Sequence, residues 1–422
     1  MKVYLDMVGC RLNQAEIERM AGQFRVEGHT LVARAAEADL VVVNTCTVTG
    51  QAASDSRQRI RQAARAGAKE VVVTGCWSTL QPAQAAELPG VTRVVPNARK
   101  DFLVADLLQL PEGSFDLEPI ARTPLPGLHR RTRAFIKAQD GCDNQCTFCI
   151  TTLARGGSRS RPLAEVAGDV RSALEGGAQE IVLTGVHLGG WGLDFGIRLG
   201  DLVQGILRET EPPRLRLSSL EPWDLDENFF SLWADPRLCP HLHLPIQSGS
   251  ASTLKRMLRK TPPDSFRGLA AAARKIIPGV AITTDVMAGF PGETEAEFAE
   301  TLDFIHEIDF AGGHVFTYSA RPGTAAARMK DQVPHEIRKQ RNHVLHAAFS
   351  EMAVRYRRKF IGRTLPVLWE SVTQASAAGW RLAGLTGNYI RVTADSPEPR
   401  WNQIDTVKLV ELAEDGVAGE IV

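Results

Sequence analysis

The sequence predicts a multidomain α/β protein with a parallel sheet at its N-terminus, a partial (βα)6 barrel in the middle and a small β-barrel at its C-terminus. Three observations carry this prediction. Strands alternate with helices in the first part, six more strand-then-helix units follow a proline-rich linker, and short β-type runs fill the last part. At 422 residues the chain exceeds the size of a single hydrophobic core. The segments we expect are 1–110, a linker at 111–131, 132–358 and 360–422.

The composition is that of an ordinary globular protein, with 44% hydrophobic and 23% charged residues. The sequence has no run of the ~20 apolar residues that a membrane span needs, and Asp6 and Arg11 interrupt the start where a signal peptide requires an apolar core. We therefore expect a cytoplasmic protein that has no membrane segment. The net charge is zero, so any nucleic-acid binding must depend on local basic patches.

Three of the seven cysteines stand at the ends of predicted strands in the first segment. The runs "KVYLDMVGC", "LVVVNTC" and "VVVTGC" end at Cys10, Cys46 and Cys76. Helical patterns over residues 17–24 and 51–66 separate these runs, so the strands should be parallel. Because the carboxyl ends of parallel strands share one edge, the three cysteines should meet there and hold a metal. The alternative is that each cysteine packs as a small hydrophobic residue.

A second set, Cys142, Cys146 and Cys149, follows the first strand of the predicted barrel, at the rim where barrel enzymes carry their active sites. The barrel strands we expect are "RAFIKAQ" (133–139), "EIVLTG" (180–185), "RLRLSS" (214–219), "HLHLPIQ" (241–247), "AITTDVMAGF" (281–290) and "GGHVFTYS" (312–319). Structural zinc is one interpretation, but such sites are closed by a fourth ligand that no nearby histidine or cysteine offers. Three thiolates on a 4Fe-4S cubane leave one iron without a protein ligand.

The Cys-x3-Cys-x2-Cys spacing on a six-unit, TIM-like barrel resembles the radical S-adenosylmethionine (SAM) superfamily. The whole chain resembles its methylthiotransferase branch through "GCRLNQAE", "NTCTVT", "TGCWS", "DGCDNQCTFCI", "RGGSRSR", "SSLEP", "HLHLPIQSGS" and "GFPGET". Such enzymes have an N-terminal domain with an auxiliary 4Fe-4S cluster, a radical SAM core and a C-terminal, OB-like β-barrel called TRAM. Within the branch, "GCRLNQAE" and "HVFTYSARPGT" look most like the enzymes that act on N6-threonylcarbamoyladenosine at tRNA position 37.

The resemblance implies a two-stage reaction that consumes two SAM molecules. One methylates a sulfur on the cluster held by Cys10, Cys46 and Cys76. The other yields a radical at the cluster held by Cys142, Cys146 and Cys149, and the radical removes hydrogen from carbon 2 of the adenine, which takes the methylthio group. The implied partners are the anticodon stem-loop of tRNA and an electron donor such as a flavodoxin or ferredoxin.

The resemblance and the predicted strand ends also suggest residues around the cofactor. Phe148 would pack beside the SAM adenine, with ordinary core packing as the alternative. Backbone groups after the second strand would hold the methionine, with a plain loop as the alternative. The remaining candidates are strand-end or barrel-facing polar residues. The full set is Phe148, Thr184, Gly185, Glu221, Gln247, Ser248 and Asp285.

Basic residues in two places suit RNA phosphates, against the alternative of solvated surface charge. Residues 335–363 carry eight Lys or Arg and two Glu, and form a predicted basic helix. Residues 361–422 carry five basic and eight acidic residues, so we do not expect this barrel alone to bind RNA tightly. The RNA candidates are Arg155, Arg159 and Arg161 after the tight cysteine set, and Arg357 and Arg358 in the basic helix.

Three functional alternatives stay open on sequence grounds. The same chemistry could act on isopentenyladenosine tRNA or on a ribosomal protein, and only the substrate separates these cases. A protein of another class, an iron-sulfur RNA-binding protein without turnover, would be expected to have a fourth ligand for each cluster, which two sets of three cysteines do not provide.

Overall fold

The computed structural model describes residues 1–115, 132–376 and 379–422 of the chain. Most of the predicted linker at 111–131 therefore lies outside the described residues. The chain forms two compact units, which are described separately. The first unit comprises Met1–Gln145, Cys149–Glu211 and Arg321–Gly323, and the second comprises Cys146–Phe148, Pro212–Ala320 and Thr324–Val422. These units do not follow the segment boundaries expected from the sequence.

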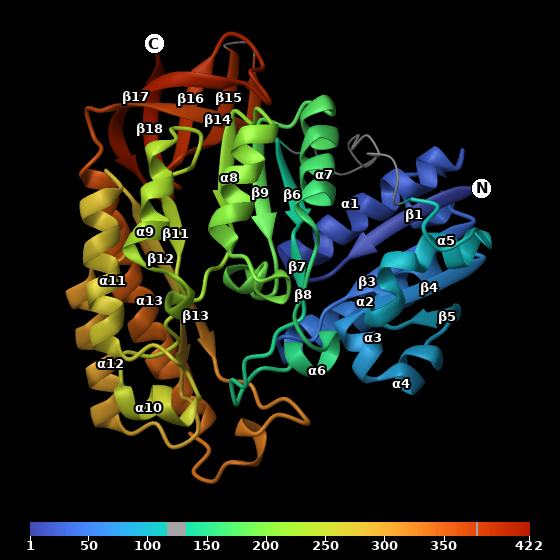
Figure 1. Ribbon diagram of the computed structural model, residues 1–422, viewed down its shortest axis with the longest axis horizontal. Coiled ribbons are helices and arrows are strands. Elements are labelled where there is room, and N and C mark those ends of the chain that lie inside the picture. Colours follow the sequence, from blue (N-terminus) through green and yellow to red (C-terminus); the bar gives the residue numbers. More distant parts are fainter. Residues whose placement is uncertain (116–131, 377–378) are drawn as a thin grey trace. The chain divides into compact units, whose positions relative to one another are not determined.

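The first unit begins with a five-stranded parallel sheet of order β2-β1-β3-β4-β5, of which Figure 1 labels β1, β3, β4 and β5. All six side chains of β3 are buried, as expected for a central strand covered on both faces. The hydroxyl of Thr49 accepts a hydrogen bond from the backbone N–H of Ala52 and so begins α2. The strands are β1 (Lys2–Met7), β2 (Thr30–Leu31), β3 (Leu40–Thr45), β4 (Glu70–Gly75) and β5 (Val91–Val95). The α-helices are α1 (Arg11–Val26), α2 (Gly50–Arg65), α3 (Cys76–Leu80), α4 (Pro82–Ala86) and α5 (Leu103–Leu108), and the 3₁₀ helices, labelled η throughout, are η1 (Ala35–Glu37) and η2 (Asn97–Phe102).

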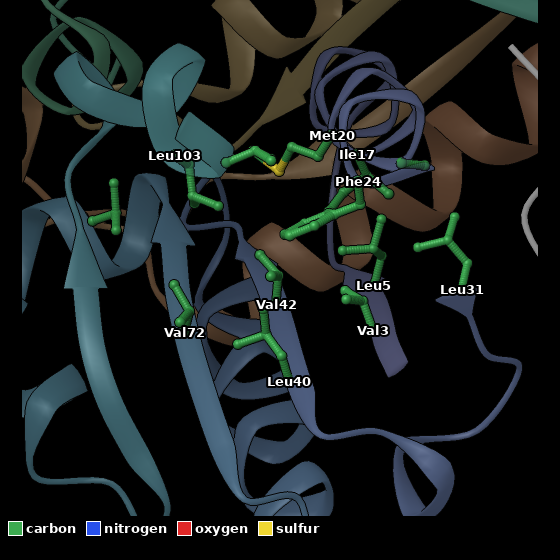
Figure 2. Close-up of a cluster of buried hydrophobic side chains, with 13 residues drawn as sticks. Val3, Leu5, Ile17, Met20, Phe24, Leu31, Leu40, Val42, Val72 and Leu103 are labelled. Carbon is green, nitrogen blue, oxygen red and sulfur yellow. The ribbon is translucent and has the colours of Figure 1, made fainter. Parts of the chain in front are cut away.

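Helix α1 packs on one face of this sheet through apolar residues spaced three or four apart. Figure 2 shows Ile17, Met20 and Phe24 directed toward side chains of the strands. Their partners in this buried cluster include Val3 and Leu5 of β1. Burial of this face fixes the start of α1, and therefore the position of Cys10 immediately before it.

The rest of the first unit supplies two of the six strands predicted for the middle segment. Strand β6 pairs with β9 in parallel, and β7 pairs with β8 in an antiparallel ladder. The elements are β6 (Arg133–Lys137), β7 (Gln139–Asp140), α6 (Thr151–Arg155), β8 (Arg159–Ser160), α7 (Leu163–Glu175), β9 (Glu180–Thr184), η3 (Leu188–Gly190), η4 (Leu193–Phe195) and α8 (Leu199–Glu209). The loop that carries Cys142 and Cys149 lies between β7 and α6.

The second unit holds the other four strands of the middle segment. Strands β11, β12 and β13 form a parallel sheet. Two isolated parallel bridges, Leu215 to Leu238 and Ser219 to His243, join β10 and the segment after it to the region of β11. The elements are β10 (Arg214–Leu217), η5 (Pro222–Asp224), α9 (Glu227–Phe230), η6 (Ser231–Ala234), β11 (His241–His243), α10 (Ala251–Arg256), α11 (Pro263–Ile276), β12 (Ala281–Ala288), α12 (Glu295–Ile308), β13 (Gly312–Thr317), η7 (Ala326–Arg328) and α13 (His335–Arg358). All six strands predicted for the middle segment are present.

The second unit ends in a closed five-stranded barrel of order β14-β15-β16-β18-β17. Its core includes Val367, Trp369 and Leu409, and Tyr356 of α13 and Phe360 just after that helix pack against it. The strands are β14 (Thr364–Ser376), β15 (Gly379–Thr386), β16 (Arg391–Ser396), β17 (Ile404–Ala413) and β18 (Gly416–Ile421). The predicted α/β class with parallel sheets and a C-terminal β-barrel is thus confirmed.

Two arginines of β10 attach this barrel to the rest of the second unit. The Arg214 guanidinium donates to the carbonyl oxygens of Leu385 at 2.8 Å and Pro366 at 2.6 Å. The fully buried Arg216 donates to the Gly387 carbonyl at 3.0 Å. Hydrogen bonds from buried charged donors are the stronger kind, so the barrel is held firmly to β10. Across the described ranges, no helix is both long and apolar enough to cross a membrane.

Candidate functional site

The structure brings Cys10, Cys46 and Cys76 together at one edge of the N-terminal sheet. Cys10 precedes α1, Cys46 follows β3 and Cys76 begins α3 directly after β4. Cys46 and Cys76 are buried, and Cys10 is exposed. Burial raises the pKa of the Cys46 thiol to about 11, and the nearby Cys10 and Cys76 thiols add to this rise. We call these three residues the thiol triad.

Two glycines allow the triad to assemble. Gly9 has φ +113°, and a Cβ at this position would lie 2.7 Å from both Cβ and Sγ of Cys46. Gly75 has φ +103°, and its Cβ would collide with the backbone of Thr45. Each glycine immediately precedes a cysteine, so the Gly-Cys pairs of the sequence mark places where two strand ends approach too closely for a side chain.

Amide groups surround the triad with hydrogen bonds to sulfur. Asn97 of η2 donates to Sγ of Cys76 at 3.7 Å, and the Cys10 thiol donates to Oδ1 of Asn13 at 3.9 Å. Asn13 in turn donates to the carbonyl oxygens of Val8 at 2.7 Å and Thr45 at 3.1 Å, so one side chain joins the ends of β1 and β3. As a donor to sulfur, Asn97 favours the thiolate of Cys76, whereas Asn13 orients Cys10 and the two strand ends.

The donor set of the triad, three cysteine sulfurs, is the one that iron-sulfur clusters use. In the described ranges, no three His, Cys, Asp or Glu side chains converge closely enough for a single metal ion. The ligands of a cubane cluster attach to different iron atoms and need no common point. The residues present therefore fit a cluster.

Arg155, at the end of α6, is not available for the RNA contact that the sequence suggested. Its side chain is 1% exposed, and it donates to the Glu16 carboxylate at 2.8 Å and to the Asp140 carboxylate at 2.9 Å. Burial alone would raise the pKa of Glu16, but the guanidinium of Arg155 and the ammonium groups of Lys100 and Lys137 hold it well below its ordinary range. The charge of Arg155 predicts a position on the protein surface, whereas in the structure the side chain is buried in the first unit and paired with two carboxylates.

The loop with the second set of cysteines has its own local contacts. In the first unit, the Cys142 N–H donates to the Gly156 carbonyl at 3.0 Å, and the Asn144 N–H donates to Sγ of Cys142 at 3.4 Å. Cys142, Cys146 and Cys149 are all half-buried. Because they span eight consecutive residues, their spacing along the chain keeps them close enough to serve one group.

In the second unit, Cys146 lies against an arginine that sequence reasoning missed. Arg259 donates to Sγ of Cys146 at 3.7 Å and forms a forked pair with Glu221 at 3.1 and 2.6 Å. Its guanidinium also lies 4.4 Å from the centre of the Trp223 ring. Burial would lower the pKa of Arg259, but Glu221 and Cys146 raise it. The 113-residue separation from Cys146 left no sequence signal for this contact.

The cofactor candidates have different environments. In the second unit, Phe148 packs edge-on against Phe290 at 6.5 Å, and Asp285 lies 3.2 Å from Nε2 of His243. The Ser248 hydroxyl is fully buried and bonded to Thr301, so the structure does not favour a cofactor contact for it.

Three further candidates are held mainly by backbone geometry. Gln247 adopts φ 73° and exchanges backbone hydrogen bonds with β12. In the first unit, Thr184 ends β9 and is buried, and the Cα of Gly185 faces Gln139, whose Oε1 would lie 2.9 Å from an added Cβ. The close approach of the Gln139 side chain therefore leaves little room for a side chain at position 185.

The remaining RNA candidates differ in exposure. The Arg159 side chain is 54% exposed, whereas Arg161 is 14% exposed and pairs with Asp169 at 2.7 Å. On α13, Arg358 is exposed and Arg357 is half-buried against backbone carbonyls. Arg159 and Arg358 are therefore the members of this set that present free surface to a phosphate.

Comparison with known families assigns two segments of the chain. Residues 2–96 match a family described as uncharacterized protein family UPF0004. Residues 136–305 match the radical SAM superfamily. The first match contains the thiol triad, and the second begins just before Cys142.

Relatives of known name resemble nearly the whole chain. A threonylcarbamoyladenosine tRNA methylthiotransferase MtaB from Bacillus subtilis is 36% identical over 97% of this chain and 94% of its own. The protein of the same name from Thermotoga maritima is 34% identical, over 98% and 96%. A tRNA-2-methylthio-N(6)-dimethylallyladenosine synthase from Cereibacter sphaeroides is 32% identical, over 99% and 98%.

Among solved structures, the radical SAM methyltransferase TsrM from Kitasatospora setae has a similar fold. The TM-score is 0.60 at 18% identity, covering 77% of this chain and 75% of that one. At this identity the likeness concerns the fold alone. It agrees with the α/β elements described above.

Proposed function

Because the chain belongs to the radical SAM methylthiotransferase family, we propose that it adds a methylthio group to carbon 2 of N6-threonylcarbamoyladenosine at position 37 of tRNA. The observation that carries this proposal is the similarity, over almost the full length, to relatives named for threonylcarbamoyladenosine tRNA. The thiol triad within the segment that matches UPF0004 supports it, because methylthio transfer needs a sulfur-bearing site besides the radical SAM site.

The main alternative is the same chemistry on dimethylallyladenosine tRNA, which a relative of 32% identity is named for. The two proposed substrates differ at N6: one has a threonyl carboxylate and the other an apolar chain. Substrate identity, and not the cofactor set, separates the alternatives.

The enzyme's cofactors are SAM and 4Fe-4S clusters. Cys10, Cys46 and Cys76 would hold the auxiliary cluster, and Cys142, Cys146 and Cys149 would hold the radical SAM cluster. When bound, these groups supply the radical and sulfur chemistry that unactivated C–H bonds require. The chain positions these groups. Asn97 donates to Sγ of Cys76, Asn13 orients Cys10 by accepting from its thiol, and Arg259 donates to Sγ of Cys146 and so stabilises its thiolate.

tRNA is the substrate class of the named relatives. We extend this to contact with the anticodon stem-loop, electron supply by a flavodoxin or ferredoxin, and action in the cytoplasm. We keep the division into an N-terminal domain (1–110), a radical SAM core (132–358) and a TRAM-like barrel (360–422) as part of the proposal. Arg159 and Arg358 are the proposed phosphate contacts that the exposure of their side chains favours.

The substrate is tested by mass spectrometry of tRNA nucleosides from cells with and without the gene. Deletion should abolish methylthio-threonylcarbamoyladenosine and leave its unmethylthiolated precursor in its place. Methylthio-dimethylallyladenosine in the same digest is the internal control and should be unchanged. Loss of that nucleoside instead would assign the alternative substrate, and an unchanged profile would contradict tRNA as the target.

The two-cluster assignment is tested by counting iron. Anaerobic reconstitution of the full chain with iron and sulfide should give about eight irons per chain, since each cubane holds four. Replacing Cys142, Cys146 and Cys149 with alanine together should halve this number, and so should replacing the thiol triad. Cys239, which is buried and outside both sets, provides the control: Cys239→Ala should keep all the iron. Bound zinc, or a total of four irons, would contradict the assignment.

A further inference from the structure

Three consecutive residues, Ala154, Arg155 and Gly156, are linked by hydrogen bonds to both cysteine sets within the first unit, to the thiol triad through Asn97 and Asn13 and to Cys142 directly. The Ala154 carbonyl accepts a hydrogen bond at 2.7 Å from Asn97, the same amide that donates to Cys76. The Gly156 carbonyl accepts from the N–H of Cys142 at 3.0 Å. The backbone before Arg155 is therefore linked through Asn97 to the thiol triad, and the backbone after Arg155 is bonded to Cys142 of the second set.

The Arg155 side chain makes a second link between the same places. Its Nη2 donates to Oδ1 of Asn13 at 2.8 Å, and that oxygen also accepts from the Cys10 thiol. Its Nη1 donates to Asp140, whose carboxylate accepts from the N–H of Gly141, immediately before Cys142. The guanidinium is thus linked to Cys10 through Asn13. It also bonds to Asp140, which lies two residues before Cys142 in the chain.

The charge of Arg155 interacts electrostatically with a cysteine of the triad as well as with its two carboxylate partners. Cys76 is among the groups whose negative charge stabilises the protonated guanidinium, after Glu16 and Asp140. The side chain is 1% exposed, so water screens this interaction little. Glu16 is fully engaged by Arg155 and Lys100, which keeps the guanidinium in place.

We propose that Arg155 is a positioning residue for the auxiliary site: with Asn97 it favours the more negative state of the group bound to the thiol triad, and it fixes the triad to the loop of Cys142. This inference rests on the proposed function, because it presupposes a cluster on the triad. Charge and hydrogen bonds to sulfur are recognised determinants of cluster potential. A buried cation that shares the Asn13 oxygen with Cys10 favours the reduced form, since reduction adds negative charge.

The reduction potential of the auxiliary cluster measures this role directly. The full chain with Cys142, Cys146 and Cys149 replaced by alanine isolates the auxiliary cluster, which is titrated with reductant and followed by electron paramagnetic resonance. In this background Arg155→Met should lower the equilibrium constant for reduction tenfold or more, which is about 59 mV for a one-electron couple. Arg155→Lys keeps the positive charge but not the two-nitrogen hydrogen bonding of the guanidinium, and should change this equilibrium constant less. Asn97→Leu should also lower it.

The matched control is Arg341→Met in the second unit. Arg341 is 5% exposed in its side chain and pairs with the buried Glu293 at 2.7 Å, so it reproduces the loss of a buried ion pair. The control should leave potential and spectrum unchanged. If Arg155→Met does not fold, Arg155→Lys and Asn97→Leu decide the question.

Unchanged potentials in variants that retain four irons would overturn the inference and leave the proposed function intact. Failure of the parent, with its intact thiol triad, to bind about four irons would instead contradict the proposed function. With the radical site restored, Arg155→Lys should still cleave SAM while losing methylthiolated product, because the link between the two sites is disturbed. If SAM cleavage and the yield of methylthiolated product fell in equal proportion, Arg155 would have a general structural role, and the inference would also be overturned.

Discussion

Replacing Glu16 with alanine is expected to lower the free energy of unfolding by about 3–5 kcal/mol, the cost of removing one partner from a buried ion pair. Lys100 and Arg155 both pair with this carboxylate at 2.8 Å, and their side chains are 2% and 1% exposed. Without Glu16, two buried cations lose their main counter-charge. Denaturant unfolding monitored by circular dichroism measures the change.

Two variants control this prediction. Glu112→Ala removes a surface carboxylate that is 62% exposed and pairs with Arg99 at 2.6 Å, and it should change stability by less than about 1 kcal/mol. Glu16→Gln keeps the shape but not the charge, and should fall between the alanine variant and the parent. A Glu16→Ala protein as stable as the Glu112→Ala protein would contradict the buried network.

The same carboxylate gives stability a pH dependence of predictable sign. Its folded-state pKa is held well below the ordinary value, because the attraction of Arg155, Lys100 and Lys137 outweighs its burial. The unfolded chain therefore takes up a proton first as pH falls. The contribution of Glu16 is complete above about pH 4.3, the ordinary glutamate pKa, and is lost as pH falls further toward the folded value. Glu16→Ala should flatten this part of the acid unfolding profile.

The strands that precede the two cysteine sets and those of the middle segment could be predicted from the sequence, because their apolar runs end at glycine, polar or cysteine residues. All six strands of the middle segment and the three that precede Cys10, Cys46 and Cys76 lie where expected. The elements that were not predicted have weak patterns. β2 has only two residues, and Thr92 and Arg93 in β5 are exposed. Neither strand therefore has the run of buried residues that marks a central strand.

The surroundings of the cysteines could not be predicted, because they come from contacts over long distances in the sequence. Arg155 and Glu16 are 139 residues apart, and Arg259 and Cys146 are 113 apart. A sequence shows that an arginine carries charge but not whether that charge is buried. The charge of Arg155 therefore predicts an RNA contact, whereas the structure buries its side chain. The glycines before Cys10 and Cys76 stand in the sequence, but the close approach of the strand ends that requires glycine there does not.

Gly75→Ala is expected to damage both stability and the auxiliary site. At φ +103° and ψ −175°, Gly75 occupies a backbone region that is essentially restricted to glycine. A Cβ would also collide with the backbone of Thr45, at the end of the neighbouring strand β3. Strain and collision together should lower the free energy of unfolding by about 3–5 kcal/mol. Because Thr45 and Gly75 precede Cys46 and Cys76, relief of the collision must move these two thiols apart.

The expected consequence is a protein that retains the four irons of the radical SAM site and loses most of the other four. Gly67→Ala is the matched control: Gly67 has φ +83° with nothing within 4 Å of an added Cβ, so it carries the strain of a positive φ without the collision. It should cost about 1–2 kcal/mol and keep all the iron. Iron content and denaturant unfolding of both variants separate the two effects. If Gly75→Ala kept eight irons while losing stability, the thiols would tolerate separation of the strand ends, and the assignment of this glycine to assembly of the triad would be wrong.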